Sequence, residues 1–220
     1  MQNPMVRDLY IRIRSNPYIN LFVILTRLLV GFAFIPPGLT KLLNERFTLI
    51  STDNPIGYYF EAMYQTGFYW QFIGFTQLLG ALLLMTQRFA TLGSLIFFSV
   101  LTNIWLITVS MEFTGTWIIT SLMVLANILL IIWDADKIKP LFLKDNQEYV
   151  VSKNQYPTAG KQWIIAGCIL FSTNLIAALI TRYAPGHFIL IWALSLIIST
   201  SYVIILTARA FLFFRRASKR

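Results

Sequence analysis

The sequence predicts an all-α membrane protein, in which a four-helix transmembrane bundle is followed by an additional C-terminal transmembrane hairpin and both termini are cytoplasmic. Of the 220 residues, 57% are hydrophobic and 12% are charged, against about 45–50% and about 25% in soluble domains. Six apolar stretches are each long enough to cross a hydrocarbon core of roughly 30 Å. Lysine and arginine gather between and beyond these stretches, where they set the topology.

The composition also narrows the chemistry. The net charge of +9 would suggest nucleic acid in a soluble protein, but membrane topology accounts for it, so we expect no nucleic-acid partner. Cys168 and His187 are the single cysteine and histidine, which excludes an internal disulfide and a haem held by two histidines of this chain. The sequence has no metal-ligand spacing, Walker-type loop or GxSxG elbow. We therefore expect no intrinsic cofactor, and a redox cofactor would be diffusible, such as a quinone, or a partner's.

The N-terminal part begins with a basic segment, 1–16, whose interleaved apolar residues fit either an amphipathic helix on an anionic leaflet or a solvated tail. Asn16 and Pro17 then start the first span, 17–35, as its cap and first helical residue. A Pro-Pro-Gly sequence at 36–38 predicts that this helix breaks or kinks near the opposite interface.

An aromatic connection follows, through residue 67, and predicts an interfacial re-entrant segment or a short helix lying flat on the membrane. An aromatic lid over a pocket is the alternative. Three further spans complete the predicted four-helix domain, 17–143, and they cover residues 69–86, 89–109 and 116–133.

The C-terminal part consists of a polar loop, 144–160, and a region, 161–220, with two additional spans and a basic tail. With the N-terminus inside, fourteen of the eighteen lysines and arginines fall in cytoplasmic regions and three fall outside. Arg27 is the eighteenth and lies within the first span. This bias predicts six spans with both termini in the cytoplasm.

The candidate site is built around Arg27, because a charge inside a membrane segment is expensive and normally faces protein or water. Gly31, Phe34 and Gly38 share its helix face. Each of the next three spans brings one strong polar group toward the middle of the membrane. One acid lies near the cytoplasmic end of the fourth span, where the long side chain of Arg27 could reach it by snorkelling. The resulting set of candidate residues is Arg27, Lys41, Gln77, Asn103, Asn127 and Asp134.

Three interpretations of this polar interior remain open at the level of sequence. Arg27, Gln77 and Asn127 could be interhelical hydrogen-bond staples that only hold the bundle together. They could instead line a pocket for a polar head group or a quinone, in which Arg27 and Lys41 bind anionic groups while Gln77 and Asn103 bind a carbonyl. An ion or proton path is the third interpretation.

Short motifs recur in a set order along the first four spans: Arg27-xxx-Gly31, Gly38-xx-Lys41, then Gly74-xx-Gln77-xx-Gly80 with an arginine after that helix, and Trp133-Asp134-Ala135-Asp136-Lys137. Over residues 20–143 this order resembles the DoxX-like membrane proteins, whose fourth helix closes on a similar Asp-containing sequence. Many relatives carry glutamate where this chain has Gln77, which weakens the case for proton handling there. The resemblance implies a small membrane subunit associated with thiosulfate or quinol oxidation, or with membrane-bound redox complexes.

We therefore expect an integral protein of a bacterial cytoplasmic membrane that supports a redox process and binds a quinone-like or lipid-like ligand among the first four spans. If it is an enzyme, it would be an oxidoreductase subunit without its own metal, haem or thiol pair. The alternative is a non-catalytic scaffold that contacts a protein partner or anionic lipid at the cytoplasmic face. A small transporter is a weaker alternative, because the halves show no inverted repeat.

Overall fold

All of the regular structure in the computed structural model, which describes residues 12–138 and 160–217, is helical. Six helical stretches among these residues are long and apolar enough to cross a membrane, so the predicted all-α membrane fold is confirmed. The elements are α2 (Pro17–Ala33), α3 (Ile35–Leu42), α4 (Pro55–Gln65), α5 (Phe68–Met85), α6 (Ala90–Ser110), α7 (Thr116–Trp133), α8 (Ala135–Ile138), α9 (Lys161–Tyr183), η2 (Pro185–His187) and α10 (Phe188–Ala217).

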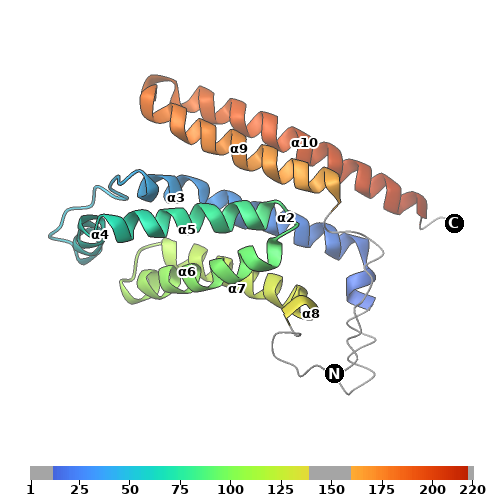
Figure 1. Cartoon of the computed structure of the whole chain (residues 1–220), viewed down its shortest axis with the longest axis horizontal. Helices are drawn as coiled ribbons and strands as arrows, with labels where there is room; N and C mark the ends of the chain where they lie inside the picture. Colours follow the sequence, from blue (N-terminus) through green and yellow to red (C-terminus); the bar gives the residue numbers. More distant parts are fainter. Residues whose placement is uncertain (1–11, 139–159, 218–220) are drawn as a thin grey trace, which may run out of the picture.

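The first and last described residues lie at the same end of the molecule (Figure 1). We call it the basic end, after the cations Arg12, Arg14, Arg88, Lys137, Lys161 and Arg209. Three predicted segments lie outside the described residues in whole or in large part: the amphipathic N-terminal segment before residue 12, the polar loop at 139–159 and the end of the basic tail at 218–220.

The first crossing is longer than the sequence predicted. The helix does not stop near residue 35, because α2 and α3 together form one membrane-length stretch, Pro17–Leu42, that bends at Phe34. The two prolines occupy the first turn of α3, where a missing backbone N–H costs nothing since that group has no intrahelical partner. As a result Lys41 lies inside the crossing and not in the connection after it.

The four-helix bundle is held by close contacts of α5 with α3 and α6, and of α6 with α7. Gly74 allows α5 to touch the backbone of α3, since a Cβ there would lie 2.6 Å from the carbonyl oxygen of Gly38. The aromatic connection contains α4, which begins at the Asn54 cap and lies across the end of the bundle opposite the basic end (Figure 1). A short helix was one of the predicted forms of this connection.

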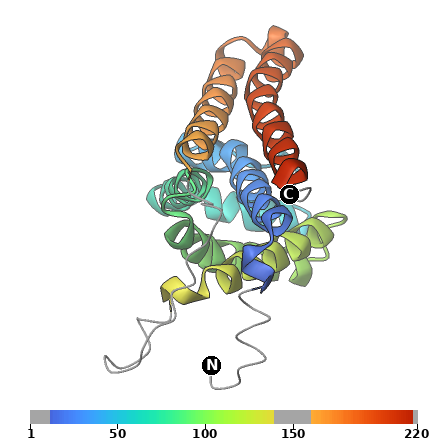
Figure 2. The ribbon, with the colours of Figure 1, turned by 90° about the vertical axis from the view of Figure 1, so that its right-hand side faces the viewer.

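The additional hairpin is attached to the bundle mainly through α9, which contacts α2, α3 and α5, whereas α10 packs chiefly on α9. Figure 2 shows the hairpin standing out from the bundle, with α2 between the separated basic ends of α9 and α10. Inside the hairpin, the hydroxyl of Ser195 donates to Asn174 Oδ1 over 3.0 Å. This buried contact fixes the register of the two helices.

Candidate functional site

Arg27 is completely buried and pairs with an acid. Its Nη2 donates to Asp134 Oδ2 over 2.6 Å, and the two side chains expose 0% and 1% of their surface. Its Nη1 donates to Gln87 Oε1 over 3.3 Å. The second carboxylate oxygen of Asp134 accepts from Lys137 Nζ at 2.8 Å. The guanidinium therefore lies in a closed polar cluster formed by α2, α7, α8 and the turn before α6.

Local structure explains why these groups meet. Asp134 is the C-terminal cap of α7 and directly precedes the one-turn helix α8. The Lys137 N–H of that turn donates to the Asp134 carbonyl over 2.9 Å. Gln87 occupies the short turn between α5 and α6 with φ of +60°, a left-handed conformation that is uncommon for residues other than glycine. That turn directs the Gln87 amide into the bundle, where the residue is 2% exposed.

The sequence identified Asp134 as the nearest counter-charge, within reach of a snorkelling Arg27, and grouped Gln77 and Asn127 with Arg27 as neutral polar partners at similar depth. The contact with Asp134 is present, whereas in the described part of the chain no hydrogen bond joins Arg27 to Gln77 or Asn127, and its second partner is Gln87. Gln87 was missed altogether. Its signal was a long polar side chain in a very short turn between two apolar spans.

Gln77 and Asn127 are buried elsewhere in the bundle. Asn127 is 0% exposed and its Nδ2 donates to the Ser94 carbonyl over 3.1 Å, which joins α7 to α6. Gln77 is 1% exposed and packs against Gly38 of α3. Neighbouring helices enclose both side chains, so in this conformation both act as packing contacts.

Asn103 does not belong to the polar interior, and the prediction that placed it there is corrected. The residue is exposed on α6, and its Nδ2 donates to the Ser99 carbonyl of its own helix over 2.7 Å. The inward face of α6 is instead formed by residues such as Ser94, Phe97 and Leu101. Asn103 follows Leu101 by two residues, which places it about 200° around the helix.

Lys41 lies at the far end of α3 under aromatic rings. Its Nζ donates to the Pro37 carbonyl over 3.2 Å and lies 4.3 Å from the ring centre of Phe47 and 5.1 Å from that of Trp70. The residue is 6% exposed. Cation–π contact supplies part of the stabilisation that a carboxylate would give. The structure thus separates Lys41, at the far end of the first crossing, from Arg27, which lies near its middle.

A lateral cavity of about 310 Å³ lies between α2 and α7 at the basic end. Its walls are mainly apolar and include Val23, Leu129 and Leu130. Trp133 closes one side and is 8% exposed, and its indole Nε1 has no hydrogen-bond partner among the described residues. The Arg14 guanidinium lies 5.3 Å from the centre of that ring and pairs with Asp136.

No protein-family model, curated protein or solved structure matches this chain. The resemblance to the DoxX-like proteins stays a prediction. Within the residues that the structure describes, no three His, Cys, Asp or Glu side chains lie close enough together to hold a metal ion.

Proposed function

We propose that this protein is a DoxX-like accessory subunit of a redox process in a bacterial cytoplasmic membrane, and that it holds a quinone-like or lipid-like molecule in the cavity between α2 and α7. The observation that carries the proposal is the buried Trp133 indole N–H, which has no hydrogen-bond partner among the described residues and belongs to a side chain that lines an apolar cavity. Leaving a buried donor unsatisfied costs about 1–3 kcal/mol. A ligand carbonyl that met the N–H after a small rotation of the ring toward the cavity would remove this cost.

The dimensions and chemistry of the cavity support a ligand of this class. Its volume of about 310 Å³ lies at the lower end of the range for small-molecule sites, about 300–1,000 Å³. Such sites combine apolar walls with a few placed polar groups, and here these are Trp133 and Arg14. An apolar tail would extend outward along α2 and α7 into the bilayer.

The buried cluster around Arg27 serves this site indirectly. The ion pair with Asp134 joins α2 to α7, and these two helices are the walls of the cavity. Removing one partner of a buried ion pair typically costs about 3–5 kcal/mol. Arg27 is thus a staple that fixes the spacing of the two walls, and the ligand contacts fall to the cavity-lining residues of α2 and α7.

The proposal is tested by extracting quinones and lipids from the purified full-length protein and quantifying them by mass spectrometry. Trp133→Phe removes the N–H and keeps an aromatic ring, while Leu129→Trp fills the cavity. Leu125→Trp is the matched control, because Leu125 is 58% exposed on the same helix, close to the 59% of Leu129, and does not line the cavity. We expect ligand recovery to fall in the first two variants and to persist in the control.

Equal recovery from all folded variants would contradict the assignment of the ligand to this cavity. Co-purification from source membranes in mild detergent tests the redox association, which predicts a membrane or soluble redox enzyme among the bound proteins. A stable stoichiometric partner with no bound quinone or lipid would favour the alternative, a non-catalytic scaffold. The apolar surface of α10 supports the scaffold alternative, because only 17% of the most apolar part of its span is buried within the protein. The remaining surface is large enough to contact a partner helix.

A further inference from the structure

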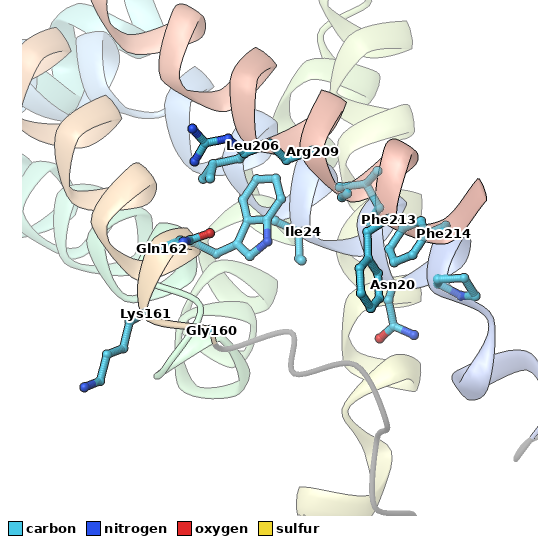
Figure 3. Close-up of a pocket in the computed structure, with 13 residues that line it drawn as sticks. Asn20, Ile24, Gly160, Lys161, Gln162, Leu206, Arg209, Phe213 and Phe214 are labelled. Atoms are coloured by element: carbon cyan, nitrogen blue, oxygen red, sulfur yellow. The ribbon is translucent and has the colours of Figure 1, made fainter. Parts of the chain in front are cut away.

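A second cavity, of about 410 Å³, lies on the opposite side of α2 at the basic end, between α2, the start of α9 and the end of α10 (Figure 3). Its polar lining includes Lys161, Gln162 and Arg209, and none of its thirteen lining residues is acidic. It shares no lining residue with the cavity between α2 and α7. This mouth is therefore electropositive and independent of the ligand site proposed above.

The arrangement of the polar groups singles out Arg209. Figure 3 shows its side chain crossing Leu206 from α10 toward α9, whereas Lys161 points away from the other labelled residues. Asn20 lies in the α2 wall and is 3% exposed, and its Nδ2 donates to the Arg14 and Asn16 carbonyls. Its Oδ1 has no partner in the described part of the chain. The cavity thus has a buried acceptor in its α2 wall and an exposed cation on α10.

The electropositive cavity continues into an apolar one. A space of about 250 Å³ lies between the same three helices, lined by residues that include Leu28, Leu170 and Thr200. On α2 the lining passes from Ile24 in the first cavity to Leu25 in the second. On α10 it passes from Leu206 to Val203, one turn deeper into the membrane. The two cavities thus follow one another along the same three helices, with a cationic mouth and an apolar inner part, and we call them together the hairpin groove.

We propose that the hairpin groove holds one anionic phospholipid of the surrounding bilayer, with its phosphate at Arg209 and an acyl chain along α2 between α9 and α10. Basic pockets between transmembrane helices at the cytoplasmic side are characteristic sites for anionic head groups. The apolar continuation distinguishes a lipid from a soluble anion, which would use the mouth alone.

The occupant also accounts for the position of α10. This helix packs chiefly on α9, and Tyr18 of α2 meets Phe211 of α10 at a ring distance of 5.5 Å near the basic end. Between that contact and the far turn of the hairpin, α2 and α10 are separated by the groove. A bound lipid fills this separation and couples the hairpin to the bundle.

Native mass spectrometry of the full-length protein, delipidated and then reconstituted with phosphatidylglycerol or phosphatidylcholine, tests the proposal. We expect one phosphatidylglycerol molecule to be retained in preference to phosphatidylcholine. Arg209→Gln removes the charge and should lower the preference about tenfold, the size expected for a charge-assisted hydrogen bond. Arg88→Gln is the matched control, since Arg88 is an exposed cation of the same end that does not line the groove.

A second pair of variants tests the apolar part without altering charge. Thr200→Trp places bulk in the groove, whereas Ile198→Trp places it on the opposite face of the same helix, where Ile198 is 55% exposed and lines neither cavity. We expect only Thr200→Trp to lower lipid retention, with unchanged elution and helical content for all variants. Equal retention of the two lipids, or unchanged preference in Arg209→Gln, would overturn the proposal. So would dependence on Arg209 without dependence on Thr200, because that result indicates a soluble anion.

Discussion

Arg27 and Asp134 are 107 residues apart in the chain and form an ion pair of 2.6 Å with almost no exposed surface. The pair joins the first crossing to the end of the fourth. Its charges have been moved from water into a low-dielectric interior, so each is stabilised almost entirely by the other and by Gln87 and Lys137. Several consequences can be measured.

Arg27→Met should destabilise the protein by about 3–5 kcal/mol, because it leaves the Asp134 carboxylate buried with only the half-exposed Lys137 as a cation. Asp134→Leu alone should cost a similar amount. The double variant should recover most of the loss, since two apolar groups carry no desolvation penalty. Thermal unfolding in detergent measures all three. Additive losses in the double variant would show that the two side chains are not coupled.

Asn127→Ala and Asn103→Ala should differ sharply, although both remove an asparagine from a membrane helix. Asn127 is buried and bonds to α6, so its loss should cost about 1–3 kcal/mol. Asn103 is exposed and bonds only within its own helix, so its substitution should change the free energy of unfolding by less than about 0.5 kcal/mol. The same thermal assay compares them, and a large effect at Asn103 would indicate a partner or ligand on that face.

Lys41→Met should leave the free energy of unfolding unchanged or raise it. Methionine keeps the length of the apolar stem, and it removes a buried cation that has no carboxylate partner among the described residues. The desolvation of an ammonium costs several kcal/mol, whereas a cation–π contact returns about 0.5–2 kcal/mol. Lys41→Ala, which also removes the stem, is the control for packing. A loss above about 1 kcal/mol in Lys41→Met would indicate that the ammonium itself is required.

Acidification should weaken the attachment of α4 to the preceding connection. Arg46 donates to both carboxylate oxygens of Glu61, over 2.8 and 3.0 Å. These hydrogen bonds lower the pKa of Glu61. A carboxyl with a lowered pKa stabilises the fold above its unfolded pKa of about 4.3, and the contribution is lost as pH falls through the folded value.

The pKa of Glu61 can be measured by NMR titration of side-chain carboxyl carbons. Glu61→Gln identifies the resonance and should abolish this part of the pH dependence. Arg46→Gln should return the Glu61 pKa toward its ordinary value. An unshifted Glu61 in the native protein would contradict the ion pair.

Local sequence was sufficient for much of the fold and for part of the candidate site. Long apolar runs bounded by Asn16-Pro17 and by polar turns specify transmembrane helices, because backbone hydrogen bonds must be satisfied within each segment in lipid. The cost of a charge in that environment made Arg27 the residue that needed a partner. Asp134 emerged as the nearest acid by counting residues along the helices.

Only the tertiary structure decided which faces turn inward and which distant groups meet. In a soluble helix the apolar face marks the core, but in a membrane both the inward and the lipid-facing sides are apolar. The pattern of α6 therefore could not distinguish Asn103, which faces outward, from Ser94, which faces inward. The contact of Gln87 with Arg27 and the groove beside Arg209 depend on how separate helices pack, because neither is encoded in any single stretch of the chain.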